Sequence, residues 1–239
     1  MIPYIIINGV SSRNIDGLLI QSLPPITKPK IRTSIEEIDG RDGDIVTTLG
    51  YAAYDKPITI GLKGDYNVDD IIEYFNTSGK ITFSNELDKY YNFAIYDTID
   101  FNKLIRFKTA NINLHVQPFK YSVDEPPIVN NNTREQTIID IPVRNTGNIY
   151  SKPKLTITGS NTITVYLGNT QIFSIDLSAA GETIIIDAAE MNATDGAGNY
   201  LNRQVTGDYN NFVLATGSNS IRVTGTITKV TLENYSRWI

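Results

Sequence analysis

The stretch Glu36-Glu-Ile-Asp-Gly-Arg-Asp-Gly-Asp-Ile45 has the residue types of a tight turn between two β-strands. Asp-Gly occurs twice in it, and this dipeptide favours hairpin turns because glycine adopts a positive φ without steric cost. Gly40 and Gly43 supply that freedom, while Asp42 can accept hydrogen bonds from nearby N–H groups. Arg41 can reach carboxylates with a forked pair of bonds. The flanking strands are predicted at Ile31–Asp39 and Asp44–Thr48.

Outward from this hairpin, the first half of the chain is rich in strand-forming residues. Ile, Thr, Val and Tyr recur in short runs, and Asn, Asp and Gly separate the runs. Ile112, Leu114 and Val116 alternate with polar residues, which places them on one face of a strand. The further strands are predicted at Tyr4–Asn8, Gly17–Leu23, Lys56–Lys63, Lys80–Ser84, Tyr91–Asp97 and Leu104–Tyr121.

One amphipathic helix is predicted in this half. Asn67 is a favourable N-cap residue, and Asp70 three residues later completes a pattern similar to a capping box. Gly79 is expected to end the helix, since glycine commonly follows the last helical residue. The apolar positions that follow the helical period are Val68, Ile71, Ile72 and Phe75. This helix should pack on a sheet.

The composition changes around Asp124–Asn132, which is rich in Pro and Asn and predicts a linker at residues 126–136. The linker would separate a first domain, residues 1–125, from a second, residues 137–239. Short strands at regular spacing, without a convincing helix, predict a β-sandwich or jelly roll for the second domain. They are expected at Thr137–Val143, Lys154–Thr158, Thr162–Leu167, Gln171–Leu177, Thr183–Asp187, Asn211–Val213, Ser220–Thr224 and Thr228–Asn234.

The composition excludes much of the usual catalytic chemistry. The chain has 239 residues, no cysteine and one histidine, so thiolate catalysis, disulfides and multi-histidine metal sites within one subunit are excluded. The net charge is −5 and the pI about 5.0, unlike a nucleic-acid-binding protein. Neither a signal peptide nor a membrane span is predicted, because Met1–Gly9 has no basic region and no long apolar run occurs. We expect a non-enzymatic protein made in the cytoplasm.

The residues that could carry catalysis or bind a metal have simpler structural explanations. His115 falls on the polar face of its strand, and the sequence nominates no acid or nucleophile as its partner. The loop Asp195-Gly-Ala-Gly-Asn199 is superficially similar to calcium-binding loops but lacks their alternating oxygen ligands. The carboxylates at the first turns of the helix, which capping and the helix dipole explain, are Asp69, Asp70 and Glu73. We predict no catalytic residue, metal site or cofactor.

Aromatic side chains of the second half leave a binding function open. Jelly rolls are common lectin scaffolds, and exposed aromatic rings can stack on sugars. The candidates are Tyr166, Tyr200, Tyr209 and Trp238. These rings could equally be half-buried at the rim of a sandwich. A carbohydrate-binding module that recognises cell-wall polysaccharide is therefore an alternative function. A glycoside hydrolase would need two carboxylates facing one cleft, and no motif marks such a pair.

The hairpin stretch also resembles a known family. Gly40-Arg-Asp-Gly43, between a strand that ends in Glu36-Glu37 and a strand that begins at Ile45, resembles the signature of siphophage distal tail proteins. The C-terminal half is similar to that family's second domain, with Ala215-Thr216 before Gly217 where the family has proline. The segments that carry this similarity are Ile184–Asp187, Gly207–Tyr209, Phe212–Leu214, Gly217–Ile221 and Arg237–Trp238. The resemblance covers nearly the whole chain.

This resemblance implies a fold, a role and a set of partners. The fold is mainly β, with an N-terminal β-sandwich and one flanking helix, followed by a C-terminal jelly roll similar to galectins and carbohydrate-binding modules. The role is structural: a homo-hexameric ring, single or stacked, in the virion tail tip. The ring would join the tail-tube protein to tail-associated or baseplate proteins and leave a channel for DNA. Its expected contacts are Asp39–Ile45, which includes Arg41 and Asp42, and Leu104–Tyr121. No catalysis and no cofactor are implied.

Overall fold

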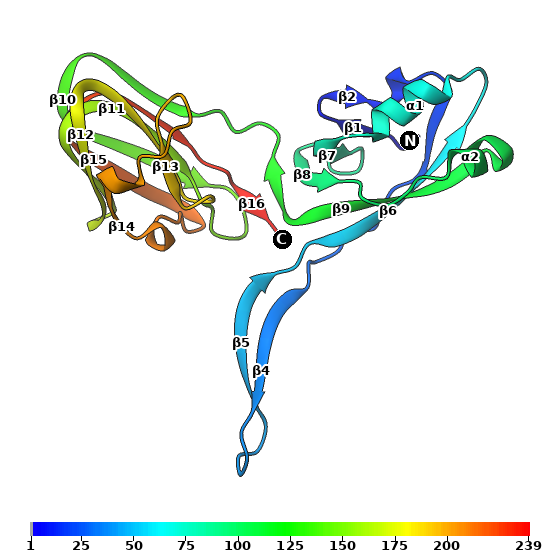
Figure 1. Ribbon diagram of the computed structural model, residues 1–239, viewed down its shortest axis with the longest axis horizontal. Coiled ribbons are helices and arrows are strands. Elements are labelled where there is room, and N and C mark those ends of the chain that lie inside the picture. Colours follow the sequence, from blue (N-terminus) through cyan, green and yellow to red (C-terminus); the bar gives the residue numbers. More distant parts are fainter. Residues whose placement is uncertain (1) are drawn as a thin grey trace. The chain divides into compact units, whose positions relative to one another are not determined.

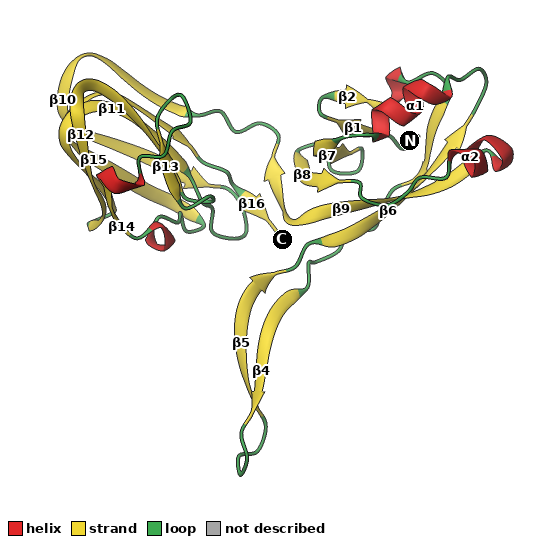
Figure 2. Cartoon of the chain, viewed as in Figure 1, coloured by secondary structure: helices red, strands yellow, loops and turns green. Residues whose placement is uncertain are grey.

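The protein consists of two compact units, each built mainly from β-strands (Figure 1; Figure 2). The computed structural model describes residues 2–239, and the side chains of all of these except residues 132, 133, 179 and 180. The segment up to Val123, together with Ile239, forms the first unit, and Asp124–Trp238 forms the second. The prediction of a mainly β fold is confirmed.

The first unit is built on one antiparallel sheet. Its strands are β1 (Ile5–Ile7), β2 (Val10–Ser11), β3 (Leu18–Ser22), β6 (Tyr54–Leu62), β7 (Ser78–Phe83), β8 (Lys89–Ala94) and β9 (Thr109–Ser122), with a 3-10 turn at Ser12–Asn14. They are hydrogen-bonded in the order β2-β1-β7-β8-β9-β6-β3. On β9, Ile112, Leu114 and Val116 are at most 2% exposed, so the predicted inward face of this strand is confirmed.

Helix α1 (Val68–Phe75) begins where the sequence predicts and covers the core of this sheet. The Asn67 side chain accepts a hydrogen bond from the Asp69 backbone N–H at 3.0 Å, so the predicted cap is confirmed. The Asn67 amide also donates to the Asp70 carboxylate at 3.0 Å. The buried face carries Tyr74, whose hydroxyl lies 3.1 Å from the carbonyl oxygen of Val10. Packing against the sheet therefore fixes the amphipathic face.

The predicted end of this helix is wrong. Asn76 is the C-cap, and Gly79 lies inside strand β7, paired with Phe93 of β8. Gly79 has φ +137°, and a Cβ there would lie 2.2 Å from the Asn8 side chain. The glycine therefore accommodates this positive φ and the nearby Asn8 side chain, and it does not terminate the helix.

A second helix, α2 (Phe101–Phe107), occupies the start of the stretch predicted as one long strand. The Asp100 side chain caps it by accepting from the Lys103 backbone N–H at 2.9 Å, and Lys108 ends it with φ 57°. The prediction of a strand from Leu104 is therefore wrong up to Lys108, and the unit has two helices instead of one. Asp100 is a favourable N-cap residue, but Phe101, Ile105 and Phe107 after it also favour a strand.

Strands β4 (Ile31–Glu37) and β5 (Asp44–Tyr51) form a two-stranded sheet of their own. Figure 1 shows them as a long ribbon that leaves the main sheet. The prediction of a hairpin around the Asp-Gly turns is confirmed, with Glu37 paired to Asp44 across its last register position. We refer to residues 31–51 as the arm.

The second unit is one antiparallel sheet of long strands. Its strands are β10 (Ile128–Asn145), β11 (Lys154–Leu167), β12 (Thr170–Asp187), β13 (Asn192–Thr194), β14 (Val205–Gly207) and β15 (Gly217–Glu233). The segment also contains the two-residue strand β16 (Arg237–Trp238), which is not part of this sheet, and 3-10 turns at Asn202–Gln204 and Tyr209–Asn211. The order is β10-β15-β11-β12-β13, and β14 also pairs with β12. The prediction of a strand at Asn211–Val213 is wrong, since a 3-10 turn ends at Asn211, and Phe212 and Val213 lie in neither a helix nor a strand.

Several short strands predicted in this unit are halves of longer, bent strands. Register shifts near Gly159 and Gly225 divide β11 and β15 into two halves each. A Cβ at Gly159 would lie 2.4 Å from the carbonyl oxygen of Thr226, so only glycine allows the two backbones to approach this closely. Both halves of β11 supply the same core, for example Ile157 and Ile163, each 0% exposed. The bend therefore lets one sheet enclose its own apolar face.

The prediction of a linker at residues 126–136 is wrong from Ile128 onward. Strand β10 begins there, and Ile128–Asn131 pair with Lys229–Leu232 of β15. Asparagine is tolerated because β10 is an edge strand whose first residues are largely exposed. Pro126 and Pro127 precede the strand, where their missing N–H groups break no ladder bond. Independent folding of the two units stays a prediction.

Two buried tyrosines of the first unit predict a loss of stability at alkaline pH. Burial raises the pKa of Tyr74 and of Tyr91 above the ordinary value of a phenol. The stabilisation is full below pH 10 and is lost above it, because the unfolded chain releases these protons first. Each tyrosine should contribute a slope of about 1.4 kcal/mol per pH unit. Urea unfolding measured between pH 8 and 11 should show that the free energy of unfolding falls less steeply with pH in Tyr91→Phe than in the wild-type protein. An equally steep fall in both proteins would contradict this assignment.

Candidate functional site

The arm exposes more apolar surface than a free hairpin can stabilise. Ile35 is 58% exposed, Val46 58% and Leu49 57%, and Ile38 near the turn is 48% exposed. A two-stranded ribbon without a covering layer is marginally stable in water, and an exposed apolar edge tends to pair with another chain. The composition of the arm therefore points to a surface that a partner covers.

One face of the arm combines apolar and acidic pairs. Ile35 lies directly across from Val46, and Glu37 lies across from Asp44 two positions nearer the turn. Side chains two residues apart share a strand face, so both pairs lie on the same side. Like charges placed directly opposite each other destabilise a ribbon. We call Ile35, Val46, Glu37 and Asp44 the arm face.

The predicted contact loop lies at the turn of the arm. Gly40 and Gly43 adopt φ +80° and +78°, as the sequence predicts for a tight turn. The backbone N–H of Arg41 donates to the carbonyl of Ile38 at 3.1 Å. All residues from Glu36 to Asp44 are exposed, including the side chains of Arg41 and Asp42. That this loop makes ring contacts stays a prediction.

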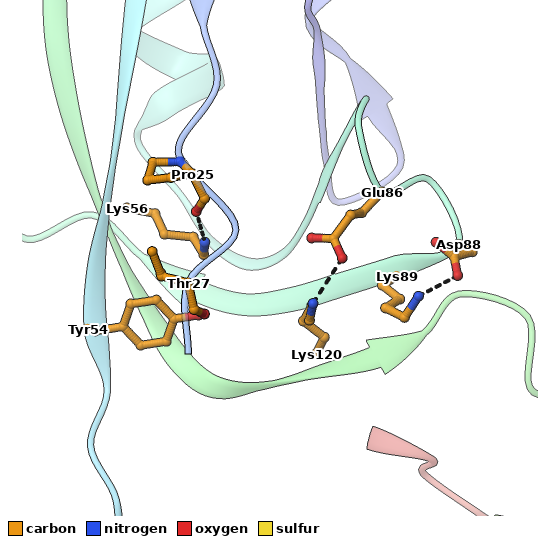
Figure 3. A network of polar contacts seen from close by, with 8 residues as sticks. All are labelled: Pro25, Thr27, Tyr54, Lys56, Glu86, Asp88, Lys89 and Lys120. Atoms are coloured by element: carbon orange, nitrogen blue, oxygen red, sulfur yellow. Dashed lines mark hydrogen bonds and ion pairs between the residues drawn. The ribbon is translucent and has the colours of Figure 1, made fainter. Parts of the chain in front are cut away.

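A buried lysine anchors the base of the arm (Figure 3). Lys56 of β6 is 2% exposed, and its ammonium group donates to the carbonyl of Pro25 at 2.9 Å, in the segment that leads into β4. Burial lowers the pKa of Lys56, and the nearby Glu86 carboxylate partly opposes this shift. The Tyr54 hydroxyl donates to the carbonyl of Thr27 at 3.4 Å. These contacts fix where the arm leaves the sheet.

A second polar pair stands beside this anchor. Lys120 of β9 and Glu86 form an ion pair of 2.9 Å, with side chains 9% and 15% exposed. Figure 3 shows this pair on the same side of the sheet as Lys56, with Lys89 and Asp88 farther along. Buried pairs of this kind fix geometry more than they stabilise, because desolvation offsets much of the attraction.

Lys56→Ala is expected to loosen the base of the arm. The substitution removes the hydrogen bond to Pro25 and the packing of the lysine stem, which together should cost about 1–3 kcal/mol. Lys56→Met keeps most of the stem and should cost less. Hydrogen exchange of the β4 and β5 amides should rise in Lys56→Ala, together with a lower urea midpoint. Equal protection in all three proteins would show that Lys56 does not hold the arm.

The single histidine has an acidic partner that the sequence did not reveal. His115 Nδ1 lies 2.9 Å from the Asp55 carboxylate, because β6 and β9 pair these residues directly. This contact lowers the pKa of Asp55. The Tyr96 ring lies 5.5 Å from the imidazole, at the edge of a hollow of about 820 Å³. Within residues 2–239, Asp55 is the residue whose side chain hydrogen-bonds to His115.

The aromatic candidates of the second unit do not form one platform. Tyr200 is 74% exposed, whereas Tyr209 packs on Phe173 with ring centroids 5.1 Å apart. Tyr166 lines a separate hollow of about 320 Å³ beside Arg222. Trp238 is half-buried in β16. Sugar stacking by these residues stays a prediction.

The remaining candidates lie in the 195–199 loop and in helix α1. Asp195 accepts from the backbone N–H groups of Ala197 and Asn199, each at 2.8 Å, and the Asn199 contacts lower its pKa. Asp69 and Asp70 lie in the first turn of α1, where the Asp70 carboxylate accepts from the Asn67 amide, and Glu73 lies one turn further along the helix. Within residues 2–239 we find no cluster of three or more acidic or histidine side chains placed to hold a metal. No helix in the same range is long and apolar enough to cross a membrane.

Comparison with solved structures identifies the fold. No protein-family model and no curated protein sequence matches the chain. The crystal structure of the Dit protein of phage SPP1 (gp 19.1), a hub of the adsorption apparatus in phages that infect Gram-positive bacteria, is similar with a TM-score of 0.65. The alignment covers 98% of this chain and 100% of that one, at 19% identity. A chain of the phage P2 baseplate in its activated conformation aligns over 98% of each chain, at 10% identity and a TM-score of 0.49. This chain therefore has the fold of the SPP1 Dit protein over nearly its whole length.

Proposed function

We propose that the chain is a structural subunit of a phage tail tip, located at the distal end of the virion tail after synthesis in the host cytoplasm. The observation that carries the proposal is the match to the SPP1 Dit fold through both units, since that protein is described as a hub of the phage adsorption apparatus. The sequence resemblance around Gly40–Gly43 points to the same group of proteins independently. Fold alone does not fix function, so the proposal also rests on the exposed arm.

The subunit would assemble head to tail into a closed ring, a homo-hexamer with a channel for DNA. Head-to-tail contacts use two different surfaces of one chain, and they close into a ring when the rotation permits. An arm with an exposed apolar face supplies one such surface. The net charge of −5 suits a channel for DNA, because an acidic lining would repel a polyanion instead of binding it.

Within a tail, the ring would join the tail-tube protein on one side to tail-associated or baseplate proteins on the other. This role is an adaptor's and needs no catalysis. The first unit would make the ring, and the second would stay available for other contacts, including host cell-wall saccharide.

Light scattering across a concentration series, combined with negative-stain images, tests the ring. We expect annuli with six-fold symmetry, or a mass near six subunits of 26.6 kDa each. Because neighbouring tail proteins stabilise such rings, binding to the tail-tube protein of the same phage is the second measurement. A protein that stays monomeric and also fails to bind tail-tube protein would refute the proposal, and glycan-array binding would then favour a carbohydrate-binding module.

A further inference from the structure

The arm face needs a partner with a particular chemistry. Its apolar pair, Ile35 and Val46, stands next to its acidic pair, Glu37 and Asp44, at a spacing of about 7 Å along each strand. None of these carboxylates forms an ion pair within the described residues. The complementary surface would carry an apolar group next to two cations.

Helix α2 presents such a surface on the same chain. Its inner side is held by Leu104, which is 1% exposed. On the outer side, Phe107 is 60% exposed, and Lys103 and Arg106 are exposed beside it. Residues three and four positions apart are neighbours on a helix, with Cβ atoms about 5–6 Å apart. We call Lys103, Arg106 and Phe107 the helix patch.

The helix patch is also incomplete within one chain. Neither Lys103 nor Arg106 forms an ion pair in residues 2–239, and the Arg106 guanidinium lies only over the exposed Phe107 ring, 5.3 Å from its centroid. Ile105 adds a further apolar side chain that is 38% exposed. The helix patch therefore complements the arm face. Its two cations are opposite in charge and equal in number to the two carboxylates, and each charged pair lies next to an exposed apolar group.

We infer that the arm face of one copy docks on the helix patch of the next copy, with Ile35 and Val46 against Phe107, and Glu37 and Asp44 against Lys103 and Arg106. This contact rests on the proposed ring and supplies its two different surfaces. It would relieve the repulsion between Glu37 and Asp44 and cover apolar surface on both elements. Charge complementarity would also set the register of the ring.

Cross-linking can test this contact even if the ring is weak in solution, because the chain has no cysteine of its own. Thr48→Cys labels the arm face and Asn102→Cys labels α2, both at exposed positions. Mixing the two proteins with a short bis-maleimide should give a covalent dimer. In the matched control, the Thr48→Cys protein is mixed with an Ala197→Cys protein, whose cysteine stands at an exposed position of the second unit. A yield no higher than in this control would overturn the inference.

Charge reversal then tests the pairing. Glu37→Lys with Asp44→Lys on the arm chain should lower the yield at least about tenfold, because like charges would face each other. Lys103→Glu with Arg106→Glu on the helix chain should do the same, and combining the two reversed chains should restore the dimer. Yield should also fall as salt rises from about 0.05 to 0.5 M, as screening of exposed charges requires.

Other outcomes assign the arm to a different partner. Dimers of the Thr48→Cys protein with itself, at equal yield, would mean that two arms pair symmetrically.

If the wild-type protein forms rings while the reversals have no effect, this contact is refuted and the proposed function stands. If the wild-type protein forms no ring and binds no tail-tube protein, the proposed function itself fails.

Discussion

Replacing Glu36–Ile45 by the dipeptide Asn-Gly is expected to abolish ring formation and to leave the subunit folded. The change keeps the pair Ile35–Val46 next to a turn type that hairpins favour, so β4 and β5 stay paired. It removes the acidic pair and the turn that extend farthest from the sheet. Since a few central contacts dominate most interfaces, the apparent dissociation constant should rise by about 100-fold or more. Light scattering and tail-tube binding are the measurements.

A matched control lies on the opposite face of the same ribbon. Ser34 and Thr47 form a cross-strand pair on the side opposite the arm face, and both have short hydroxyl side chains. Ser34→Ala with Thr47→Ala should leave assembly within about twofold of wild type, since small surface changes affect stability little. Normal assembly of the shortened protein would show that the arm is dispensable, even if the chain is a tail-tip subunit.

Gly159→Ala is expected to unfold the second unit at temperatures where the wild-type unit is stable. The new Cβ would lie 2.4 Å from the Thr226 carbonyl oxygen and 2.8 Å from Ile163 Cδ1, and backbone cannot move aside cheaply in a sheet. Separating these strands also opens the core at Ile163, so the loss should reach about 3 kcal/mol or more. Thermal unfolding followed by circular dichroism, with limited proteolysis of the segment Asp124–Trp238, measures this loss.

The control for this substitution is Gly196→Ala in the same unit. Gly196 has no atom within 4 Å of an added Cβ, so its replacement should change the free energy of unfolding by no more than about 0.5 kcal/mol. If the units fold independently, the first unit of the Gly159→Ala protein should keep its β-rich circular dichroism and resist mild proteolysis. Loss of both units together would contradict the predicted independence.

Several features of the protein follow from local sequence alone. The Asp-Gly turns fix the hairpin because glycine is the residue that adopts a positive φ without cost, and Gly40 and Gly43 do so. Asn67 starts α1 because its side chain satisfies an N–H group within two residues. Alternation predicts the buried face of β9 because strand side chains repeat every two residues. Each of these signals spans only a few neighbouring positions.

The interaction surfaces depend on contacts that local patterns do not encode. His115 meets Asp55 only through the register of β6 and β9, and Gly159 is required only because Thr226 lies against it in a neighbouring strand. The sequence of α2 is rich in β-prone residues, and packing of Leu104 on the core, together with the Asp100 cap, makes it a helix. Sequence alone thus determined the turns, caps and strand periodicity. Tertiary structure decided which side chains face solvent and which residues meet, because pairing between distant segments depends on long-range packing.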